Sequence, residues 1–554
     1  ELLGLFYWIF DLMIQKPIEN IQNKALLIRT KMAKLVYMSI PRSVIAEYDE
    51  DGNPSAVIVR WELEQMQCCA DIGVTVLSPM IRDYYFPGKY KPYIHQLKIC
   101  SFLTTNKRAL CFADMGTGKS LAVVHCIKYL LDIGEIKRAL IIAPLSTLTR
   151  TWSDEFFNVD SSITVTKLVG TKAKRIELAD NGAQVHVINY EGINVIYNKI
   201  KANDYDCVVI DEITAYSNHE SQRWKEAFNL FKNTKYMWGL TGTPILRGVT
   251  AAYGQALLVV PHNVKFRSFW EFRNAVQRKI NRFLWVDRPE SHDIVFSMLR
   301  PAISIKKKDC IDLPPVVHVY REVELGKGQL AFYMKLKEEL LVKDEAIQVT
   351  AVNAAVLAGK LIQIATGCIY DDKGRILEFD VSGRIAETID FIQKARGEAS
   401  MTDKGKTIVF TPFKHTAVLI RKLLSEAKIT VDGKERKIRA ELIDGDVSAR
   451  QRDDIFERFK EDNNLDIIVA IPQTMSHGLT LTNASCIVWF GPCSSAETYT
   501  QACNRIDRPG QTESMTIAHL YSTPAEWKLY SNLRENKKSE NYLLMFYKDF
   551  LREI

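Results

Sequence analysis

The sequence has no C-x-x-C pair, no internal repeat and no apolar run long enough to cross a bilayer. Its 11 cysteines are scattered, so neither a zinc site nor a disulfide framework has the spacing that it needs, and we expect a reducing compartment. The absence of repeats excludes solenoids and propellers. The apolar residues 2–14 (LLGLFYWIFDLMI) are too few to span a membrane and lack the features of a signal peptide, so we expect a docking helix or an extension there.

The composition is that of a folded chain, with 47% hydrophobic, 25% charged and 10% aromatic residues. A length of 554 residues predicts about three to four units of roughly 100 to 200 residues each. The net charge of +7 is only mildly basic for this size, so it permits a nucleic-acid partner without demonstrating one. The location of the charge therefore matters more than its sum.

Short apolar runs recur along the chain, each bounded by polar or turn residues and separated by segments of helix length. This pattern is typical of parallel sheets that helices cover on both faces. About 165 residues separate two sets of runs, far more than a hinge needs, which predicts helical insertions between two α/β lobes. A turn-rich stretch at 48–54 (YDEDGNP) predicts a hairpin in a small accessory domain before the first lobe. The runs are 109–113, 139–143, 185–188, 207–210 and 236–240 in the first set, and 407–410, 440–443, 466–470 and 486–490 in the second.

Residues 113–120 read ADMGTGKS, directly after one apolar run and before a helix-like LAVVHCIKYLL. This strand–loop–helix order is the context of a phosphate-binding loop. Its glycines let backbone N–H groups close around phosphate oxygens, and the following helix adds positive potential. We expect Lys119 to meet the β and γ phosphates of ATP and Ser120 to ligate Mg²⁺. The loop residues expected to bind ATP are Gly116, Thr117, Gly118, Lys119 and Ser120.

Three polar residues elsewhere complete a candidate ATP site. Asp211 and Glu212 directly follow the apolar run at 207–210, where one carboxylate can hold Mg²⁺ while its neighbour orients and deprotonates the attacking water. We assign Asp211 to the metal and Glu212 to the water. Gln96, shortly before the phosphate loop, carries an amide that can both donate to and accept from an adenine edge. Alone, an acid pair at a strand end or a single glutamine is a weak signal, and the phosphate loop makes them strong.

Residues 501–508 (QACNRIDR) place Gln501, Arg505 and Arg508 at spacings of i, i+4 and i+7, which predicts one helix face. Arginine stays charged and can fork onto phosphate oxygens, so this face can supply arginine fingers to ATP. In isolation, the same pattern is a solvated or salt-bridged surface.

The order of these motifs resembles that of the superfamily-two helicases, and within them the Swi/Snf-type DNA translocases. The segment LRPAISIKKKDCIDLPP (299–315) and the long interlobe region favour the Swi/Snf-type branch, and the compact size is most like the versions from bacteriophages and bacteria. The matching segments are KPYIHQ (91–96), DMGTGKS (114–120), APLSTLTRTW (143–152), INYEGI (188–193), DEIT (211–214), GLTGTPI (239–245), KTIVFTPF (406–413), LIDGDVSARQR (442–452), SHGLTLTNA (476–484) and QACNRIDRPGQ (501–511).

The resemblance implies an α/β fold of two tandem RecA-like parallel-sheet lobes, with helical insertions between them and a small N-terminal accessory domain. It implies an ATP- and Mg²⁺-dependent motor that moves along duplex or branched DNA. Such a motor works as a monomer in the cytoplasm of a prokaryote or a phage-infected cell, without membrane contact, and its N-terminal domain is a candidate contact for a protein partner. The implied ranges are 1–84 for the N-terminal extension and accessory domain, 85–250 for the ATP-binding lobe, 251–400 for the helical insertions and linker, 401–530 for the second lobe, and 531–554 for a helical tail.

Motors of this kind bind the phosphate backbone, because movement along any sequence requires contacts that do not read bases. Each short polar residue that motif position assigns to DNA is equally well explained as a helix cap, and the basic run at 306–308 as a solubilising patch. The assigned nucleic-acid contacts are Ser146, Thr147, Arg150, Asn189, Tyr190, Thr411, Lys414 and Ser476, and the residues assigned to coupling are Thr241, Thr243 and Gly478.

The sequence departs from the family pattern in two motifs. Thr214 stands where the family usually has histidine, and His477 and Thr480 stand where glycines are common, which puts coupling to DNA in question more than ATP chemistry. Two other functions stay open at this point. A strand-separating DNA or RNA helicase uses the same lobes, and a non-catalytic, ATP-gated recruitment module would be expected to lose at least one of the ATP-site residues that this sequence keeps.

Overall fold

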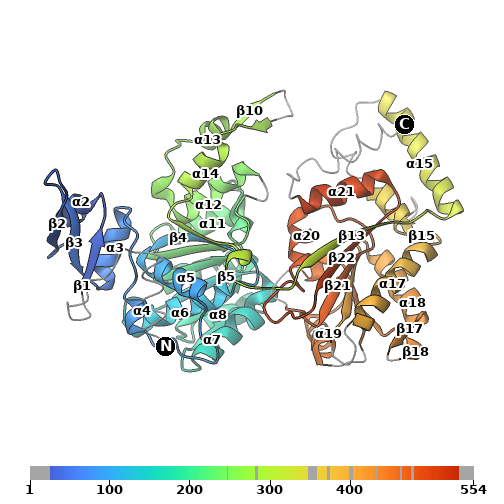
Figure 1. Cartoon of the computed structure of the whole chain (residues 1–554), viewed down its shortest axis with the longest axis horizontal. Coiled ribbons are helices and arrows are strands. Elements are labelled where there is room, and N and C mark those ends of the chain that lie inside the picture. The colour runs from blue at the N-terminus through green and yellow to red at the C-terminus, as the bar shows by residue number, and fades with distance from the viewer. Residues whose placement is uncertain are drawn as a thin grey trace. The chain divides into compact units, whose positions relative to one another are not determined.

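The computed structural model divides at residue 310 into two compact units (Figure 1). Because the apolar residues 2–14 lie outside the described ranges, the docking helix or extension expected there is not placed. No helix among the described residues is both long and apolar enough to pass through a membrane. The structure describes residues 25–245, 248–280, 285–346, 359–370, 375–398, 404–431, 433–461, 465–475 and 480–535.

The first unit is built on a seven-stranded sheet in which every neighbouring pair is parallel. All five apolar runs of the first set form strands of this sheet, as predicted. In sheet order the strands are β12 (Ala302–Ile305), β4 (Arg108–Ala113), β9 (Tyr236–Thr241), β8 (Cys207–Asp211), β5 (Ala139–Ala143), β7 (Val185–Asn189) and β6 (Val165–Lys167).

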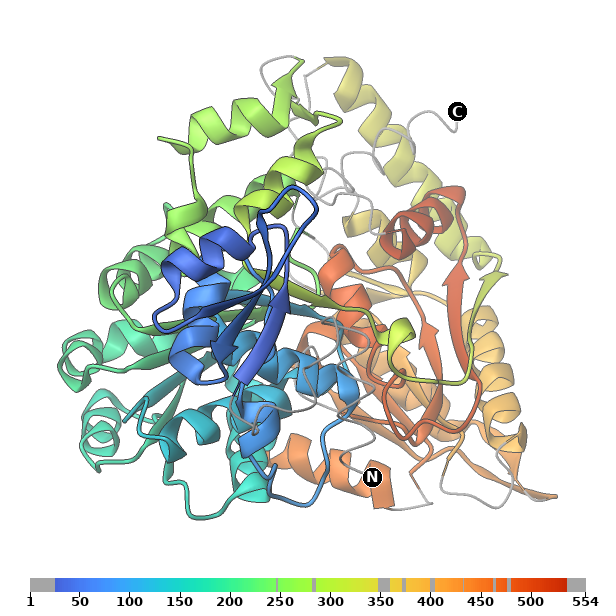
Figure 2. The same cartoon turned by 60° about the vertical axis from the view of Figure 1, so that its left-hand side comes forward.

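Helices cover both faces of this sheet (Figure 2). Alternate strand residues enter different apolar clusters: Cys111 and Val209 pack with the α5, α6 and α7 side, whereas Leu110 and Val208 pack with the α8–α14 side. This two-sided burial explains why the strands read as continuous apolar runs instead of alternating ones. The helices are α5 (Ile94–Thr105), α6 (Lys119–Asp132), α7 (Asp154–Val159), α8 (Lys172–Ala179), α9 (Tyr190–Val195), α10 (Tyr197–Asn203), α11 (Gln222–Phe231), α12 (Ala252–Val259), α13 (Phe269–Val276) and α14 (Ser291–Met298).

A small antiparallel sheet precedes this lobe in the same unit. Its strands are ordered β1–β3–β2, and the expected hairpin turn joins β2 (Val44–Tyr48) to β3 (Pro54–Arg60). The buried residues of this sheet, and of β1 (Ala25–Arg29), α2 (Ala33–Ser39) and α3 (Leu63–Asp71), belong to the same apolar cluster as α5 and α6. The sheet is therefore packed onto the lobe through a shared core.

The second unit contains a six-stranded parallel sheet, which completes the predicted pair of α/β lobes. One face packs against α17 and α18. On the other face, rings of the central strands contact rings of α20 and α21, as in the pairs Trp489–Tyr499 and His519–Tyr530. The strands in sheet order are β13 (Val316–Glu322), β22 (Met515–Tyr521), β21 (Ala484–Trp489), β16 (Lys406–Phe410), β20 (Ile467–Ala470) and β19 (Ala440–Ile443), and the helices are α15 (Lys327–Ala346), α17 (Ser382–Glu398), α18 (Lys414–Glu426), α19 (Ala449–Glu461), α20 (Ala496–Cys503) and α21 (Pro524–Arg534).

The range 251–400, for which helical insertions and a linker were expected, also supplies an edge strand to each sheet. β12 pairs with β4 in the first unit, and β13 pairs with β22 in the second. Between α13 and α14 the chain forms a hairpin of β10 (Gln277–Lys279) and β11 (Trp285–Asp287). The domain boundaries drawn from the sequence stay predictions.

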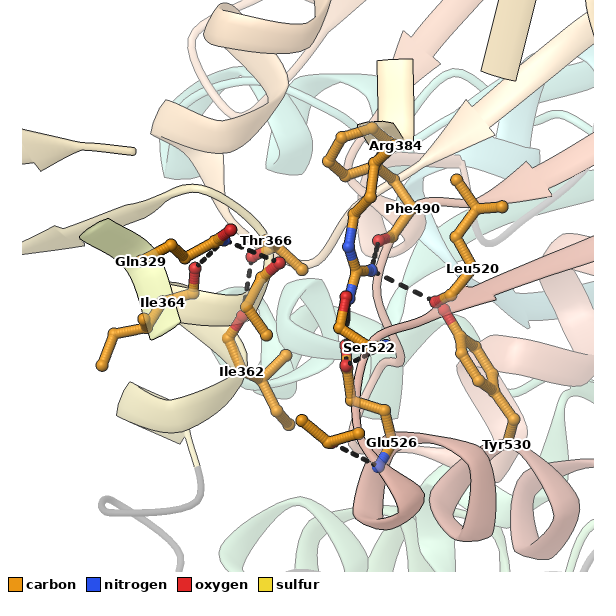
Figure 3. Close-up of polar contacts among 12 residues, drawn as sticks. Gln329, Ile362, Ile364, Thr366, Arg384, Phe490, Leu520, Ser522, Glu526 and Tyr530 are labelled. Carbon is orange, nitrogen blue, oxygen red and sulfur yellow. Dashed lines mark hydrogen bonds and ion pairs between the residues drawn. The ribbon is translucent and has the colours of Figure 1, made fainter. Parts of the chain in front are cut away.

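A buried arginine ties the strand ends of the second unit together (Figure 3). Arg384, in the first turn of α17, is 2% exposed and forms an ion pair with Glu526, which is 1% exposed. Its Nη1 donates to the carbonyls of Phe490 and Leu520, and its Nη2 donates to Ser522 Oγ and to both carboxylate oxygens of Glu526. One guanidinium thereby joins α17 and α21 to the ends of β21 and β22.

Candidate active site

The phosphate loop connects the end of β4 at Ala113 to the start of α6 at Lys119. Gly116 and Gly118 have φ values of 83° and 71°, in the left-handed region that favours glycine. The Thr117 hydroxyl donates to the Asp114 carbonyl at 2.8 Å, which closes the turn. The N–H groups in the first turn of a helix have no partner within the helix, so the start of the 14-residue α6 can receive an anion.

Two side chains of α5 contact backbone carbonyls of the phosphate loop. His95 Nε2 lies 2.8 Å from the Thr117 carbonyl, and Gln96 Nε2 donates to the carbonyls of Thr117 and Gly118 at 3.3 Å each. Burial lowers the pKa of His95, so the ring is neutral at pH 7. A Cβ on Gly118 would come within 2.0 Å of Gln96 Nε2, so a residue with a side chain there would displace the glutamine.

The Gln96 side chain is thus bound to the phosphate loop and to its own helix start. Its Oε1 accepts from the Tyr93 N–H at 2.8 Å, which caps α5. The sequence predicted that Gln96 belongs to the ATP site, and the structure places it against the phosphate loop. Its contact with adenine stays a prediction.

The sheet brings the loop lysine and the acid pair to one edge. The carboxyl ends of parallel strands meet at the same edge of a sheet, which is where ligands bind in open α/β folds. Asp211 ends β8 and Glu212 follows it. Lys119 Nζ lies 4.0 Å from Glu212 Oε1, and the two side chains are only 11% and 14% exposed. The sequence-predicted lysine and acid therefore lie together in a partly desolvated site.

Asp211 is held by two donors. Trp152 Nε1 donates to its Oδ2 and the Glu212 N–H donates to its Oδ1, each at 3.1 Å. Burial, followed by the nearby negative charge of Glu212, raises the pKa of Asp211 to about 6, while Lys119 and Trp152 oppose the rise. A divalent cation would hold this carboxylate ionised, and carboxylate and hydroxyl oxygens are ligands that Mg²⁺ prefers. Asp211 therefore fits the metal role assigned to it, and the metal role of Ser120, the second residue of α6, stays a prediction.

Glu212 adopts an unusual backbone conformation for a residue with a side chain, with φ 49° and ψ 61°. Left-handed non-glycine residues are strained and concentrate at functional sites. The Glu212 carboxylate accepts a hydrogen bond from the Thr241 hydroxyl at 3.1 Å, and that hydroxyl accepts from the Thr243 N–H at 3.2 Å. The strained backbone thus accompanies a carboxylate held between Lys119 and Thr241.

These contacts bear on the departure at Thr214. They join the acid pair to the end of β9 through Glu212 and Thr241, without a side-chain contribution from residue 214. A second link comes from Gln255 in α12, whose Nε2 donates to the Pro244 carbonyl at 2.7 Å and to Ser217 Oγ at 3.3 Å. The structure brings Thr241 and Thr243 to the acid pair as expected of coupling residues, and the coupling itself stays a prediction.

Trp152, His95 and Gln255 also belong to this site, although their sequence context did not predict them there. The signal for His95 is its position next to Gln96. For Trp152 it is the only indole in the segment 143–152, and an indole N–H that is buried needs an acceptor. Gln255 lies among apolar residues of α12, where a buried amide also needs partners.

The basic run at 306–308 lies beside the phosphate loop. β12 ends at Ile305, whose carbonyl accepts from the Asp114 N–H at 3.0 Å. The Lys307 N–H then donates to Asp114 Oδ2 at 2.9 Å. A segment nearly 200 residues further along the chain therefore braces the first residue of the loop.

The first-unit residues assigned to nucleic acid are mostly engaged inside the unit. The Thr147 hydroxyl donates to the Pro144 carbonyl, and the Tyr190 hydroxyl donates to the Asp211 carbonyl at 2.7 Å. Asn189 is held between Arg175 and Glu191. Ser146 is exposed on the short helix η1 (Leu145–Thr147), and the side chain of Arg150 lies outside the described residues. Their DNA contacts stay predictions.

The expected helix face of Gln501, Arg505 and Arg508 is wrong, because α20 ends at Cys503. The Arg505 N–H bonds to the carbonyl three residues back, and the Arg505 carbonyl accepts from the Leu481 N–H, so the chain turns into the Pro509–Gly510 pair. Arg505 is buried. Arg508 donates from Nε to the Asn504 carbonyl and from Nη1 to Thr480 Oγ1. Their role toward ATP stays a prediction.

The other second-unit residues assigned to nucleic acid or to coupling are Thr411, Lys414, Ser476 and Gly478, and only the first two are described. Thr411 is fully buried after β16, and Lys414 begins α18 and forms an ion pair with Asp446. Ser476, His477 and Gly478 lie outside the described residues. No group of three or more potential metal-ligating side chains occurs in the described part of the chain.

Comparison with known proteins gives two adjacent family matches. A model described as SNF2-related domain matches residues 54–373, and one described as helicase conserved C-terminal domain matches residues 387–510. "Putative protein p41" of Acyrthosiphon pisum secondary endosymbiont phage 1 is 23% identical over 82% of this chain and 97% of its own length. The ATP-dependent helicase FUN30 of Saccharomyces cerevisiae is 22% identical over 86% of this chain.

The chain spans 49% of the yeast helicase and 37% of an uncharacterized ATP-dependent helicase of Mycoplasma genitalium, to which it is 22% identical. Among solved structures, the "Sulfolobus solfataricus SWI2/SNF2 ATPase core in complex with dsDNA" is 21% identical, with a TM-score of 0.39 over 85% of this chain and 98% of that one.

Proposed function

The chain belongs to the SNF2-related family and is a nucleic-acid-dependent ATPase of the helicase class, and from that premise we propose that it hydrolyses ATP to move along duplex or branched DNA. The observation that carries the proposal is the placement of Lys119 beside Glu212, with Glu212 bonded to Thr241 at the end of β9. The lysine proposed to bind phosphate therefore lies next to the acid proposed to activate water, and this acid is bonded to the end of a neighbouring strand.

The chemistry follows from the positions of these side chains. The start of α6 and the Lys119 ammonium bind the negative phosphates, and partial burial strengthens their attraction. The Glu212 carboxylate orients the attacking water and accepts its proton. Ser120 and Asp211 would hold Mg²⁺, which would neutralise the charge that develops on the phosphate oxygens. Arg505 and Arg508 are proposed, by motif position, to add positive charge from the second lobe.

We propose that hydrolysis is communicated through the Glu212–Thr241–Thr243 contacts. Loss of the γ-phosphate changes what Glu212 and Lys119 bind, and the Thr241 hydroxyl is bonded directly to Glu212. A change at the nucleotide can therefore shift the segment after β9. Under this proposal the work performed on DNA is remodelling, branch migration, annealing or displacement of bound proteins in replication, recombination or repair.

Displacement of a third strand from a DNA triplex tests the proposal, because a motor that moves along duplex DNA removes that strand without separating the duplex. We expect wild-type protein to release the third strand with ATP and not without it, and Lys119→Ala to release none. The exposed Lys137→Ala is a matched control that should behave as wild type. Unwinding of a forked duplex without triplex displacement would instead identify a strand-separating helicase.

A further inference from the structure

The hairpin between α13 and α14 gathers exposed aromatic and basic side chains that the ATP site does not use. In both views of the first unit it extends beyond α13, away from the seven-stranded sheet (Figures 1 and 2). Between residues 265 and 288 the sequence has seven basic residues and two acidic ones. Such a local excess of positive charge, on a chain of modest net charge, attracts nucleic acid.

The base of this hairpin is firmly anchored. Phe272 and Val276 on the inner side of α13 are buried, and the Phe272 ring stacks on Tyr253 at 5.3 Å. Asp287 accepts from the Gln277 amide across the two strands at 2.8 Å, and Arg288 donates to the Asn274 carbonyl. The outer side of α13 is therefore presented on a fixed support.

The outer side carries an arginine between two indoles. Trp270 is 59% exposed, and Arg273 lies one helical turn further on. The Arg273 guanidinium carbon is 5.6 Å from the Trp270 ring centre and 4.1 Å from that of Trp285, and the two indoles are 6.5 Å apart. Cation–π contacts of this kind hold the rings in place. Trp270 is thus held beside Arg273 while more than half of its surface stays open to solvent.

Two cations of the hairpin, Arg278 and Lys279, have no acidic partner among the described residues. Both side chains are exposed in β10. Arg273 likewise pairs with rings and with the Gln277 amide in place of an acid. We define the hairpin surface as the side chains of Trp270, Arg273, Arg278, Lys279 and Trp285. Residues 281–284 lie outside the described residues and are not part of it.

We infer that this surface binds unpaired nucleotides of DNA, with a base stacked on Trp270 and phosphates on Arg278 and Lys279. Every base has a π-face, and base–aromatic stacking combined with basic side chains is how proteins bind single strands without reading sequence. Within a duplex each base is already stacked on its neighbours. The hairpin therefore favours forked or gapped DNA over blunt duplex. This inference rests on the proposed function, because it takes DNA as the substrate.

The test is binding of labelled DNA without ATP, followed by fluorescence anisotropy, to a blunt duplex and to the same duplex with single-stranded arms. Trp270→Ala should weaken binding to the forked DNA by about tenfold, the loss of one stacked base, and to the blunt duplex by less than about twofold. Trp527→Ala removes another exposed indole, 47% exposed on α21, and should change neither. Trp270→Phe keeps a stacking ring and should retain most of the affinity for the fork.

A second variant, Arg278→Ala with Lys279→Ala, tests the phosphate contacts independently of the ring. It should reduce the slope of log affinity against log salt by about 1.4 for the single-stranded arms, because two counterion-releasing contacts are lost. Unchanged fork binding in both variants, or equal weakening on fork and blunt duplex, overturns the inference. Because ATP is absent from this test, its failure is distinct from that of the proposed function, which falls if DNA leaves wild-type ATP turnover unchanged.

Discussion

Glu212→Gln is expected to lower the rate of ATP hydrolysis by at least about 100-fold, because loss of a positioned general base costs about 10² to 10⁴ in rate. Glutamine has nearly the same volume and can still accept a hydrogen bond from Thr241. It cannot take a proton from water, and it loses the negative charge 4.0 Å from Lys119. The site should therefore keep its shape and its affinity for ATP while turnover is lost. Turnover is measured by phosphate release, and affinity with a fluorescent ATP analogue.

Glu220→Gln is the matched control, since Glu220 is an exposed glutamate a short distance along the same segment. It should hydrolyse ATP at the wild-type rate. Wild-type turnover in Glu212→Gln would show that the water is activated elsewhere, and loss of both turnover and ATP affinity would show that Glu212 holds the nucleotide.

Arg384→Ala is expected to destabilise the second unit by about 3–5 kcal/mol, because removing one partner of a buried ion pair leaves the other charge without compensation. The substitution removes more than the ion pair with Glu526. The carbonyls of Phe490 and Leu520 and the Ser522 hydroxyl lose their donor together with Glu526. Denaturation in urea, followed by circular dichroism, measures the change.

The same helix supplies the control for this prediction. Lys394 pairs with Asp390 one turn away on α17, and both side chains are about half exposed. Lys394→Ala should cost less than about 1 kcal/mol, as exposed pairs do. The double change Arg384→Met with Glu526→Leu should be less destabilising than Arg384→Ala, because no buried charge remains. Equal stability of Arg384→Ala and Lys394→Ala would contradict the role given to the buried pair.

Most inner strands of both sheets could be predicted from the sequence because burial on both faces leaves continuous apolar runs, such as ALIIA in β5 and CVVID in β8. The inner strand β22 (MTIAHLY) was missed, because threonine and histidine interrupt its apolar residues. Of the edge strands, β19 was predicted, whereas β6, β12 and β13 were not. β12 (AISI) and β13 (VVHVYRE) are only partly buried, so their residues carry no such run. β12 pairs with β4, nearly 200 residues earlier in the chain, and no local pattern specifies a partner at that distance.

The same contrast holds for the ATP site. The spacing within ADMGTGKS and the position of Asp211–Glu212 after a strand were sufficient to bring Lys119 and Glu212 together, because the parallel fold fixes where strand ends lie. The arginine spacing was insufficient. A pattern of i, i+4 and i+7 predicts a helix, but the helix ends at Cys503 and a backbone contact with Leu481 draws Arg505 into a turn. The contacts of Trp152 and Gln255 depend on tertiary packing that no single segment encodes.

The rate of ATP hydrolysis, measured with no nucleic acid and with duplex DNA, forked DNA, single-stranded DNA and RNA, tests the central claim most directly. If the protein is a DNA-dependent motor, the rate should be at least about tenfold higher with DNA than without, and higher on duplex or forked DNA than on RNA. Lys119→Ala should show no ATP hydrolysis with any of these nucleic acids. A rate that DNA leaves unchanged, or that RNA alone raises, would contradict it.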